Sequence, residues 1–306
     1  PGSNADNSGA GSIRLFSKFD NLSSLNLGRN GGAYFHPETG NASCPEVTGS
    51  CENYNISGND FRTLNNTNGV GSGTNAVYSW QNLPGVKTVN VSSNYYLNDD
   101  TGVLESNGLA STDLESFSMS STGLTIPQLR NKPNLKTVNA AHNRSGSTFF
   151  QGGATNYKFS GCPSLEQLQL YAANIRGEWP VFNNPALKTI DLRYTQISGG
   201  GGATDTQASY PASTYAIPPN ILENCSNLEN FWFFSSQVTS QSQLGYELFE
   251  SCTSLRYFNI YCYGRLSGGI PNLSGLGNLR YAYCYWNGIT GSLPSFAGSN
   301  NIYGVQ

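Results

Sequence analysis

Charged residues make up only 11% of this 306-residue chain, and its net charge at pH 7 is −3. This balance offers no basic face for nucleic acid, and no apolar run reaches the roughly 18 residues of a membrane span. Asn, Ser, Gly and Thr are abundant, which predicts a surface that is polar without being charged. Because residue 1 is Pro, we expect a processed chain or a fragment.

The N-terminal part begins with a small, polar stretch, residues 1–12, which is typical of a linker or a frayed end. Residues 13–79 are expected to hold irregular repeats, the first of which begins at Leu22. A Gly- and Asn-rich insertion follows, and Phe61 and Leu64 suggest a degenerate repeat after it.

Two cysteines lie in this N-terminal part, Cys44 and Cys51 in the segment CPEVTGSC. Their short spacing in a Gly- and Asn-rich loop has the local look of a disulfide, with two free thiols as the alternative. A disulfide here would fit an oxidising compartment.

One pattern recurs from residue 80 to residue 306: Leu-x-x-apolar-x-apolar, followed by a polar turn. The last two apolar residues alternate as on a strand with one buried face. Recurrence about every two dozen residues is the mark of stacked coils, so this part of the chain is predicted to be a solenoid. The first positions of its repeats are Val86, Leu114, Leu135, Leu165, Leu187, Leu228, Leu255 and Leu279.

One interval between repeats is longer than the others because of an insertion from Gly199 to Ala216, whose composition predicts a surface loop. Near the C-terminal end, Ile302 and Val305 begin another copy of the pattern. We therefore expect the array to be truncated at Gln306, and the native protein to continue or to be capped.

The segments between the strands carry a second apolar pattern, seen in FSGCPSL, LENCSNL and FESCTSL. A spacing of three brings Phe or Leu, Cys and Leu inward together on a short helical or 3₁₀ turn. Cys162, Cys225 and Cys252 are therefore predicted to be buried small hydrophobes and not disulfide partners. Each coil would have short parallel strands on a concave side and short 3₁₀ or helical turns on the return side.

A polar slot follows each strand, three residues after its last apolar position. An Asn amide buried there can bond the backbone of its own coil and of the next, and a hydroxyl can do part of the same. The enrichment of Asn, Ser and Thr predicts a structural ladder and not a binding site. Its members are Asn30, Asn94, Thr122, Asn143, Thr195, Ser236 and Asn287, with Ala173 and Tyr263 as exceptions.

These residues carry a family resemblance. The segment LRYAYCYWNGITGSLP, which begins at Leu279, resembles the plant-type extracellular leucine-rich repeat LxxLxLxxNxLxGxIP. The Cys-centred segments resemble the AFxxCxxL repeats of BspA-like bacterial surface proteins. The mixture is similar to repeat-bearing structural proteins of marine bacteriophages and to bacterial surface adhesins. The resemblance covers about residues 80–306 and implies an α/β leucine-rich-repeat solenoid, mostly β and loop, in an extracellular, virion or cell-surface location.

One position after each first Leu or Val, charged residues alternate in sign until the last two, which are both positive. Because equivalent positions of neighbouring strands lie about 5 Å apart, this column predicts a cross-strand salt ladder from Lys87 to Glu229. The column comprises Lys87, Glu115, Lys136, Glu166, Lys188, Glu229, Arg256 and Arg280.

The neighbouring exposed columns change from small polar residues to aromatic ones toward the C-terminal end. One interpretation is that aromatic residues are good strand formers and stack without a partner. The other is that aromatic faces beside polar donors form a platform for sugar rings or a protein. Confinement of the rings to one end favours binding. The candidate ligand-binding residues are Trp232, Arg256, Tyr257, Asn259, Arg280, Tyr281, Tyr283 and Trp286.

Catalytic signals are weak. His36 and His142 stand without a Ser/Asp or Cys/Asp arrangement that would indicate a triad, and no His/Cys cluster has zinc spacing. Asp99, Asp100 and Glu178 could be carboxylates of a glycosidase, but sequence cannot show a pair that the fold brings together. We expect no enzyme, cofactor or metal.

The sequence therefore favours a non-enzymatic, surface-exposed protein, either tail-fibre-like in a phage virion or a bacterial adhesin. It would recognise a host cell-surface glycan or protein on the concave face of the solenoid. One alternative is a purely structural solenoid that assembles with itself or with other virion proteins into a filament or virion. Another is a parallel β-helix polysaccharide depolymerase, against which the Cys-centred turns argue.

Overall fold

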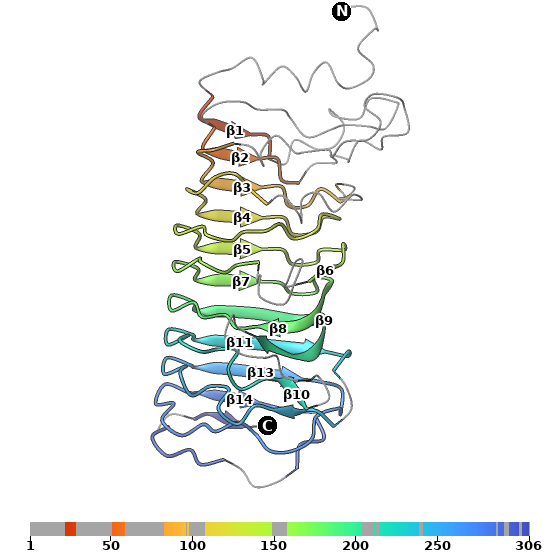
Figure 1. Ribbon diagram of the computed structural model, residues 1–306, viewed down its shortest axis with the longest axis vertical. Coiled ribbons are helices and arrows are strands. Elements are labelled where there is room, and N and C mark those ends of the chain that lie inside the picture. The colour runs from red at the N-terminus through yellow and green to blue at the C-terminus, as the bar shows by residue number, and fades with distance from the viewer. Residues whose placement is uncertain are drawn as a thin grey trace, which may run out of the picture. The chain divides into compact units, whose positions relative to one another are not determined.

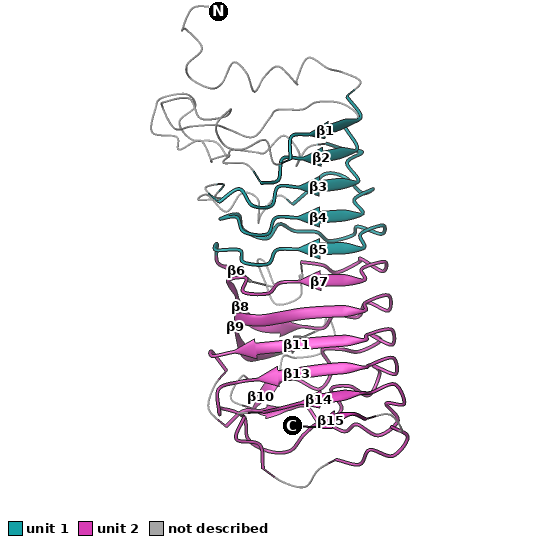
Figure 2. Cartoon of the chain, turned by 180° about the vertical axis from the view of Figure 1, so that it is seen from behind, with its two compact units in different colours: residues 1–145 teal, residues 146–306 magenta. Residues whose placement is uncertain are grey.

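The computed structural model describes residues 22–28, 51–58, 83–95, 97, 108–148, 158–203, 211, 214–238, 241–285, 287–290, 294–299 and 302–305. The chain divides into two compact units, residues 1–145 and 146–306, which Figure 2 draws in different colours. Within the described ranges all regular structure is β, and no helix that could cross a membrane is found there.

In its described residues, unit 1 holds five short strands that pair in parallel and in chain order (Figure 1). The middle residue of each strand is buried and its neighbours are more exposed, as the period-2 pattern predicts. The strands are β1 (Ser24–Asn26), β2 (Asn53–Asn55), β3 (Thr88–Asn90), β4 (Ser116–Ser118) and β5 (Thr137–Asn139).

Unit 2 has one main parallel sheet, also in chain order (Figure 1). Its strands are β7 (Gln167–Gln169), β9 (Thr189–Ala203), β11 (Asn230–Ser235), β13 (Tyr257–Tyr261), β14 (Tyr281–Tyr283) and β15 (Gly304–Val305).

Shorter pairings lie outside this main sheet. Strand β8 (Ile175–Pro180) joins β6 (Ser147–Thr148) to the later part of β9, and β10 (Tyr215–Ile217) pairs with β12 (Gln243–Leu244). One strand from each coil thus forms the main sheet of a unit, and only some return segments pair locally. This arrangement confirms the predicted fold class in each unit, stacked coils of β and loop with parallel strands on one side.

The core lies behind the main sheets, where the first apolar residue of every regular repeat is fully buried. The return side is built from single turns in place of helices. The amide of Cys225 donates to Leu222 O at 3.1 Å, and the amide of Leu228 donates to Cys225 O at 3.1 Å. These i+3 to i hydrogen bonds are of the 3₁₀ type. Cys162, Cys225 and Cys252 are buried free thiols, as the spacing predicts.

A repeat in unit 1 escaped the sequence pattern. Cys51, Tyr54 and Ile56 stand at the 0, +3 and +5 positions around β2 and are all buried. Cys51 fills the slot that Leu or Val fills elsewhere, and its Sγ lies 3.3 Å from Asn53 O. It carries a free thiol, so the expected disulfide with Cys44 is corrected: the side chain points into the core of its own coil. Cys44 itself lies outside the described residues.

The insertion that follows Ile197 is not wholly a surface loop. Gly199 to Ala203 continue β9, and Gly201 pairs with Trp179 of β8. Gly199 has a φ of +96°, and a Cβ there would lie 2.7 Å from Tyr215 O. This position requires glycine for two reasons: its backbone is left-handed, and β10 lies too close to leave room for a Cβ.

The polar slots after the strands are occupied largely as the ladder predicts. Asn94 Nδ2 donates to Ile56 O of the preceding coil at 2.9 Å and to Val91 O of its own coil at 2.8 Å. Thr122 and Thr195 donate their hydroxyls to the carbonyl oxygens three residues earlier, at 2.8 and 2.9 Å. Asn143 and Asn287 are also buried. Asn30 lies outside the described residues.

One slot of the ladder is misplaced in the sequence pattern. Ser236 is exposed, whereas Ser235 is buried and donates its hydroxyl to Ile197 O at 2.7 Å. The reason is a register shift between β11 and β9, which aligns Ser235 with Thr195. Cys262 in the next coil is likewise buried one residue earlier than expected, which explains why Tyr263 breaks the pattern.

The column of alternating charges forms ion pairs within each unit. In unit 1, Lys87 pairs with Glu52 at 3.0 Å and Lys136 with Glu115 at 3.1 Å. In unit 2, Lys188 pairs with Glu166 at 2.9 Å and Arg256 with Glu229 at 3.6 Å. Hydrogen bonding to Glu52 and Glu166 raises the pKa of Lys87 and Lys188, respectively. Most of these side chains are well exposed, so each pair stabilises the fold only slightly.

Candidate ligand-binding surface

The outward face of the main sheet in unit 2 is lined by aromatic residues in register. Trp232 of β11 lies between Asp191 of β9 and Asn259 of β13, and Asn259 is followed by Tyr283 of β14. The neighbouring column aligns Asn230, Tyr257 and Tyr281 with Gly304. We call Trp232, Tyr257, Tyr281, Tyr283 and Tyr303 the aromatic face.

Rings of the aromatic face touch one another across the strands. The ring centroids of Trp232 and Tyr257 are 5.5 Å apart, and those of Tyr257 and Tyr283 are 5.6 Å apart in a T-shaped arrangement. Tyr281 lies 6.0 Å from Tyr257, Tyr283 and Tyr303. These separations are typical of favourable aromatic pairs. Exposure rises along the row, from half-buried Trp232 to 37% for Tyr281 and 70% for Tyr303.

An ion pair that the sequence did not predict supports one end of this face. Arg193 bonds Asp191 through both ends of its guanidinium, with Nε to Oδ1 at 2.9 Å and Nη2 to Oδ2 at 2.6 Å. Its guanidinium carbon lies 4.9 Å from the ring centre of Tyr171 and 5.3 Å from that of Trp232. The hydrogen bonds to Asp191 raise the pKa of Arg193. A planar cation thus stacks between two rings and fixes the indole.

Asn259 is the second departure from the predicted face. The sequence pattern places it among exposed residues, but only 7% of it is exposed, because large side chains from neighbouring coils surround it. Its Nδ2 lies 3.3 Å from the hydroxyl of Tyr257, and its Oδ1 is buried without a hydrogen-bond partner. Buried polar atoms in native structures nearly always have a partner, which is either a protein group, an ordered water or a ligand.

The remaining predicted residues lie at the margins. Arg256 and Arg280 are both exposed, and Arg256 belongs to the ion pair with Glu229. They stand in the column next to Tyr257 and Tyr281, at the start of the strands. Trp286 lies outside the described residues, so its place beside Tyr285 is still a prediction.

A second aromatic row lies where the same strands end. It runs from Tyr171 to Tyr194, Phe234, Tyr261 and Tyr285, with adjacent ring centroids 5.4 to 5.8 Å apart. Tyr261 stacks on Tyr285 at an interplanar angle of 16°. Loss of solvation raises the pKa of Tyr261. Both rows belong to unit 2, whereas the outward positions of β3, β4 and β5 in unit 1 hold Thr, Ser and Asn.

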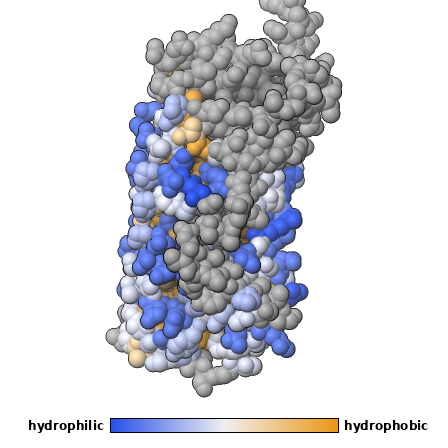
Figure 3. Space-filling view, viewed as in Figure 1, coloured by the Kyte–Doolittle hydropathy of each residue, from blue (hydrophilic) through white to orange (hydrophobic). Residues whose placement is uncertain are grey.

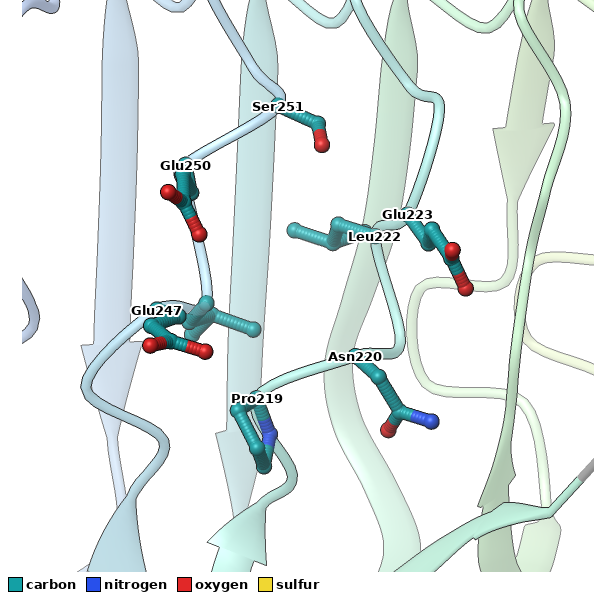
Figure 4. Close-up of a pocket in the computed structure, with 8 residues that line it drawn as sticks. Pro219, Asn220, Leu222, Glu223, Glu247, Glu250 and Ser251 are labelled. Atoms are coloured by element: carbon teal, nitrogen blue, oxygen red, sulfur yellow. The ribbon is translucent and has the colours of Figure 1, made fainter. Parts of the chain in front are cut away.

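A pocket of about 310 Å³ lies on the return side of unit 2, between two successive turns (Figure 4). Three carboxylates line the pocket. Glu247 and Glu250 lie on one turn, and Glu223 lies on the other and points away from them in Figure 4. No group of His, Cys, Asp or Glu suited to a metal ion occurs in the described part of the chain. The three carboxylates do not converge on one point, as an acid and base pair would need to do. Glu178, the other described carboxylate considered above, is exposed on β8.

The surface that Figure 3 shows is mainly hydrophilic where it is described. Tyr and Trp have hydropathies near the middle of the scale used there, so hydropathy alone does not reveal the aromatic face. Its rings combine apolar faces with polar edges.

Comparisons with known proteins add little to this picture. No protein-family model matches the chain, and no curated protein matches it. Among solved structures, one similar chain is in "Crystal structure of PEPR1-AtPEP1", with a TM-score of 0.43 and 19% sequence identity, covering 81% of this chain and 32% of that one. The chain thus spans about a third of the length of that protein.

Proposed function

We propose that this chain is a non-enzymatic binding protein that attaches to a host cell-surface glycan or protein through the aromatic face of unit 2. The observation that carries the proposal is the row of rings in contact across β11, β13, β14 and the residue before β15. Clustered, exposed aromatic residues with a few polar groups among them are typical of interaction sites.

The aromatic face is not needed to fill the core. The inward positions of the same strands, Phe231, Phe258 and Ala282, are buried, and the two Phe rings contact Phe249. The outward rings leave part of their apolar surface in water, and a partner that covered this surface would gain about 25 cal/mol for each Å² it buried. Arg193, Arg256 and Arg280 provide hydrogen-bond donors at the margins of the face.

The setting that we propose is the surface of a virion, in a tail-fibre-like part, or of a bacterial cell, as an adhesin. Two features support it. The surface is polar with few charges, and the coils combine plant-type and BspA-like repeat signatures. Both suit a protein that works outside cells on partners of varied chemistry.

Replacement of Trp232, Tyr257 and Tyr283 by Ser tests the proposal. The triple variant should lose attachment to cells and to immobilised surface glycans, yet melt within a few degrees of the wild type, because its changed side chains face outward. Tyr246→Ser is the matched control, since Tyr246 is 67% exposed on the return side. Normal attachment by a folded triple variant would contradict the proposal.

A purely structural solenoid is the second candidate. It is favoured by the contacts that the outward rings already make with one another across the strands, at centroid distances of 5.5 to 6.0 Å. If the aromatic face joined copies of the chain, the triple variant would lose self-association. Sedimentation of wild type and variant over a range of protein concentrations distinguishes this outcome from loss of attachment.

A further inference from the structure

The polar centre of the aromatic face is the amide of Asn259. Trp232 and Tyr283 stand beside it on the two neighbouring strands, and Tyr257 lies two residues before it on its own strand. One polar atom of the amide faces the Tyr257 hydroxyl at 3.3 Å, and the other is buried with no hydrogen bond. Turning the amide by 180° exchanges the two atoms but leaves one without a partner.

The orientation of the amide decides which ligand groups fit the unpaired atom, and a hydroxyl fits in either orientation. The unpaired atom is an acceptor in one orientation of the amide and a donor in the other. A hydroxyl can donate and accept, so it satisfies both, whereas a carboxylate can only accept and an ammonium can only donate. The surrounding rings require, in addition, a flat apolar surface next to that hydroxyl.

The charges around Asn259 are already paired. Asp191 holds Arg193 with two hydrogen bonds, and Glu229 lies 3.6 Å from Arg256. Arg280 belongs to the same column as Arg256. It directly precedes β14 and does not lie beside the amide. Among the described residues, an acidic ligand group would therefore meet no unpaired cation directly beside the amide, and it would lose its hydration there without compensation.

We propose that the part of the aromatic face around Asn259 is a subsite for a neutral saccharide, in which one sugar hydroxyl bonds the unpaired amide atom and the C–H face of the ring packs against Trp232, Tyr257 and Tyr283. The unpaired atom is covered in the free protein, so the proposal requires the side chains above it to shift when the hydroxyl binds. This assignment rests on the proposed function of the aromatic face and names the class of ligand that the face takes.

The test uses the full chain and a panel of soluble oligosaccharides: cellohexaose, laminarihexaose, maltohexaose, mannohexaose and hexa-N-acetylchitohexaose as neutral probes, and hexagalacturonic acid as an acidic probe. Isothermal titration calorimetry gives Kd for each. We expect at least one neutral probe to bind and the acidic probe to bind more weakly. Asn259→Leu should weaken the bound probe by about tenfold or more, since a hydrogen bond made only with the ligand is removed.

Two controls keep the result interpretable. Asn259→Ala removes the same hydrogen bond with a smaller side chain, so the assignment does not depend on how well Leu fits. Gln169→Leu removes an amide from the same outward column on β7, away from the aromatic face, and should leave Kd unchanged. Unchanged binding by both Asn259 variants would overturn the proposal, as would tighter binding of hexagalacturonic acid.

Failure of this inference can be told from failure of the proposed function. If the wild type binds none of the neutral probes but still attaches to cells through the aromatic face, the ligand is a protein and the saccharide assignment is wrong. If the wild type and the triple variant attach equally, the aromatic face is not a binding surface at all.

Discussion

The side chain of Asn287 makes two hydrogen bonds to the backbone of the coil before it. Its Oδ1 accepts from the amide of Cys262 at 2.6 Å, and its Nδ2 donates to Ile260 O at 2.7 Å. Both backbone groups lie where the preceding coil leaves the sheet, and both residues are buried. No water can replace the amide there without a cavity to hold it.

Asn287→Ala should therefore lower the free energy of unfolding by about 1–3 kcal/mol, because two buried backbone groups lose their partner. Chemical denaturation of the two proteins measures the difference. Asn278→Ala is the control, since its amide bonds Thr253 O at 3.2 Å on the exposed return side and should cost less. An unchanged denaturation midpoint for Asn287→Ala would contradict the structural role of this slot.

The register shift in β11 predicts opposite outcomes for two adjacent serines. Ser235→Ala leaves Ile197 O without the hydroxyl that bonds it at 2.7 Å, which should cost about 1–3 kcal/mol. Ser236→Ala changes an exposed side chain and should stay within about 0.5 kcal/mol of the wild type. Thermal melts of the pair decide between the two positions. Equal effects, or a larger effect at Ser236, would mean that the ladder slot follows the sequence spacing after all.

Gly199 should tolerate no side chain. Gly199→Val combines a φ of +96° with a Cβ 2.7 Å from Tyr215 O, so β9 and β10 would have to separate. We expect a loss of more than about 2 kcal/mol in unfolding free energy. Gly269→Ala is the matched control, because nothing lies within 4 Å of the added Cβ. If both variants are as stable as the wild type, β9 does not continue through this glycine.

Buried thiols make the stability of the fold fall at alkaline pH. Burial raises the pKa of Cys225 from 9.0 to about 11. The unfolded chain loses this proton above pH 9 and the folded chain only near 11, so stability that is present below pH 9 is lost between about 9 and 11. The stability difference between wild type and Cys225→Ala, measured by denaturation at pH 8 and pH 10.5, should shrink at the higher pH.

Thiol labelling provides an independent check of the same burial. Cys162, Cys225 and Cys252 should react with a thiol reagent only after the protein unfolds, because the thiolate is the reactive form. Rapid labelling of Cys225 in the native protein at pH 8, or a pH profile identical to that of Cys225→Ala, would contradict the alkaline prediction.

Much of the fold could be predicted because one short spacing rule repeats. Leu, x, x, apolar, x, apolar specifies a strand and its inward face in each coil, and the structure follows it from β3 onward. The coil at β2 was missed because Cys51 and Tyr54 stand where Leu and Val stand elsewhere. Their spacing obeys the rule even though their residue types do not, so a search by spacing alone would have found them.

The candidate site could be predicted only in part. The outward columns placed Trp232, Tyr257, Tyr281 and Tyr283 on neighbouring strands, because strand alternation determines which side a residue faces. The burial of Asn259 could not be read in this way, since it depends on how long side chains from three coils lean over it. Nor could the stacking of Arg193 on Trp232, since these two residues belong to different columns of the sheet.

The ion-pair column also bears on how such a chain can change its length. Within unit 1 the signs run Glu52, Lys87, Glu115, Lys136, and within unit 2 they run Glu166, Lys188, Glu229, Arg256. Deleting or duplicating a single coil inside either series would place two like charges on adjacent strands, whereas a change of two coils would keep the alternation. Insertions and deletions that keep the alternation of charge are therefore those of two coils at a time.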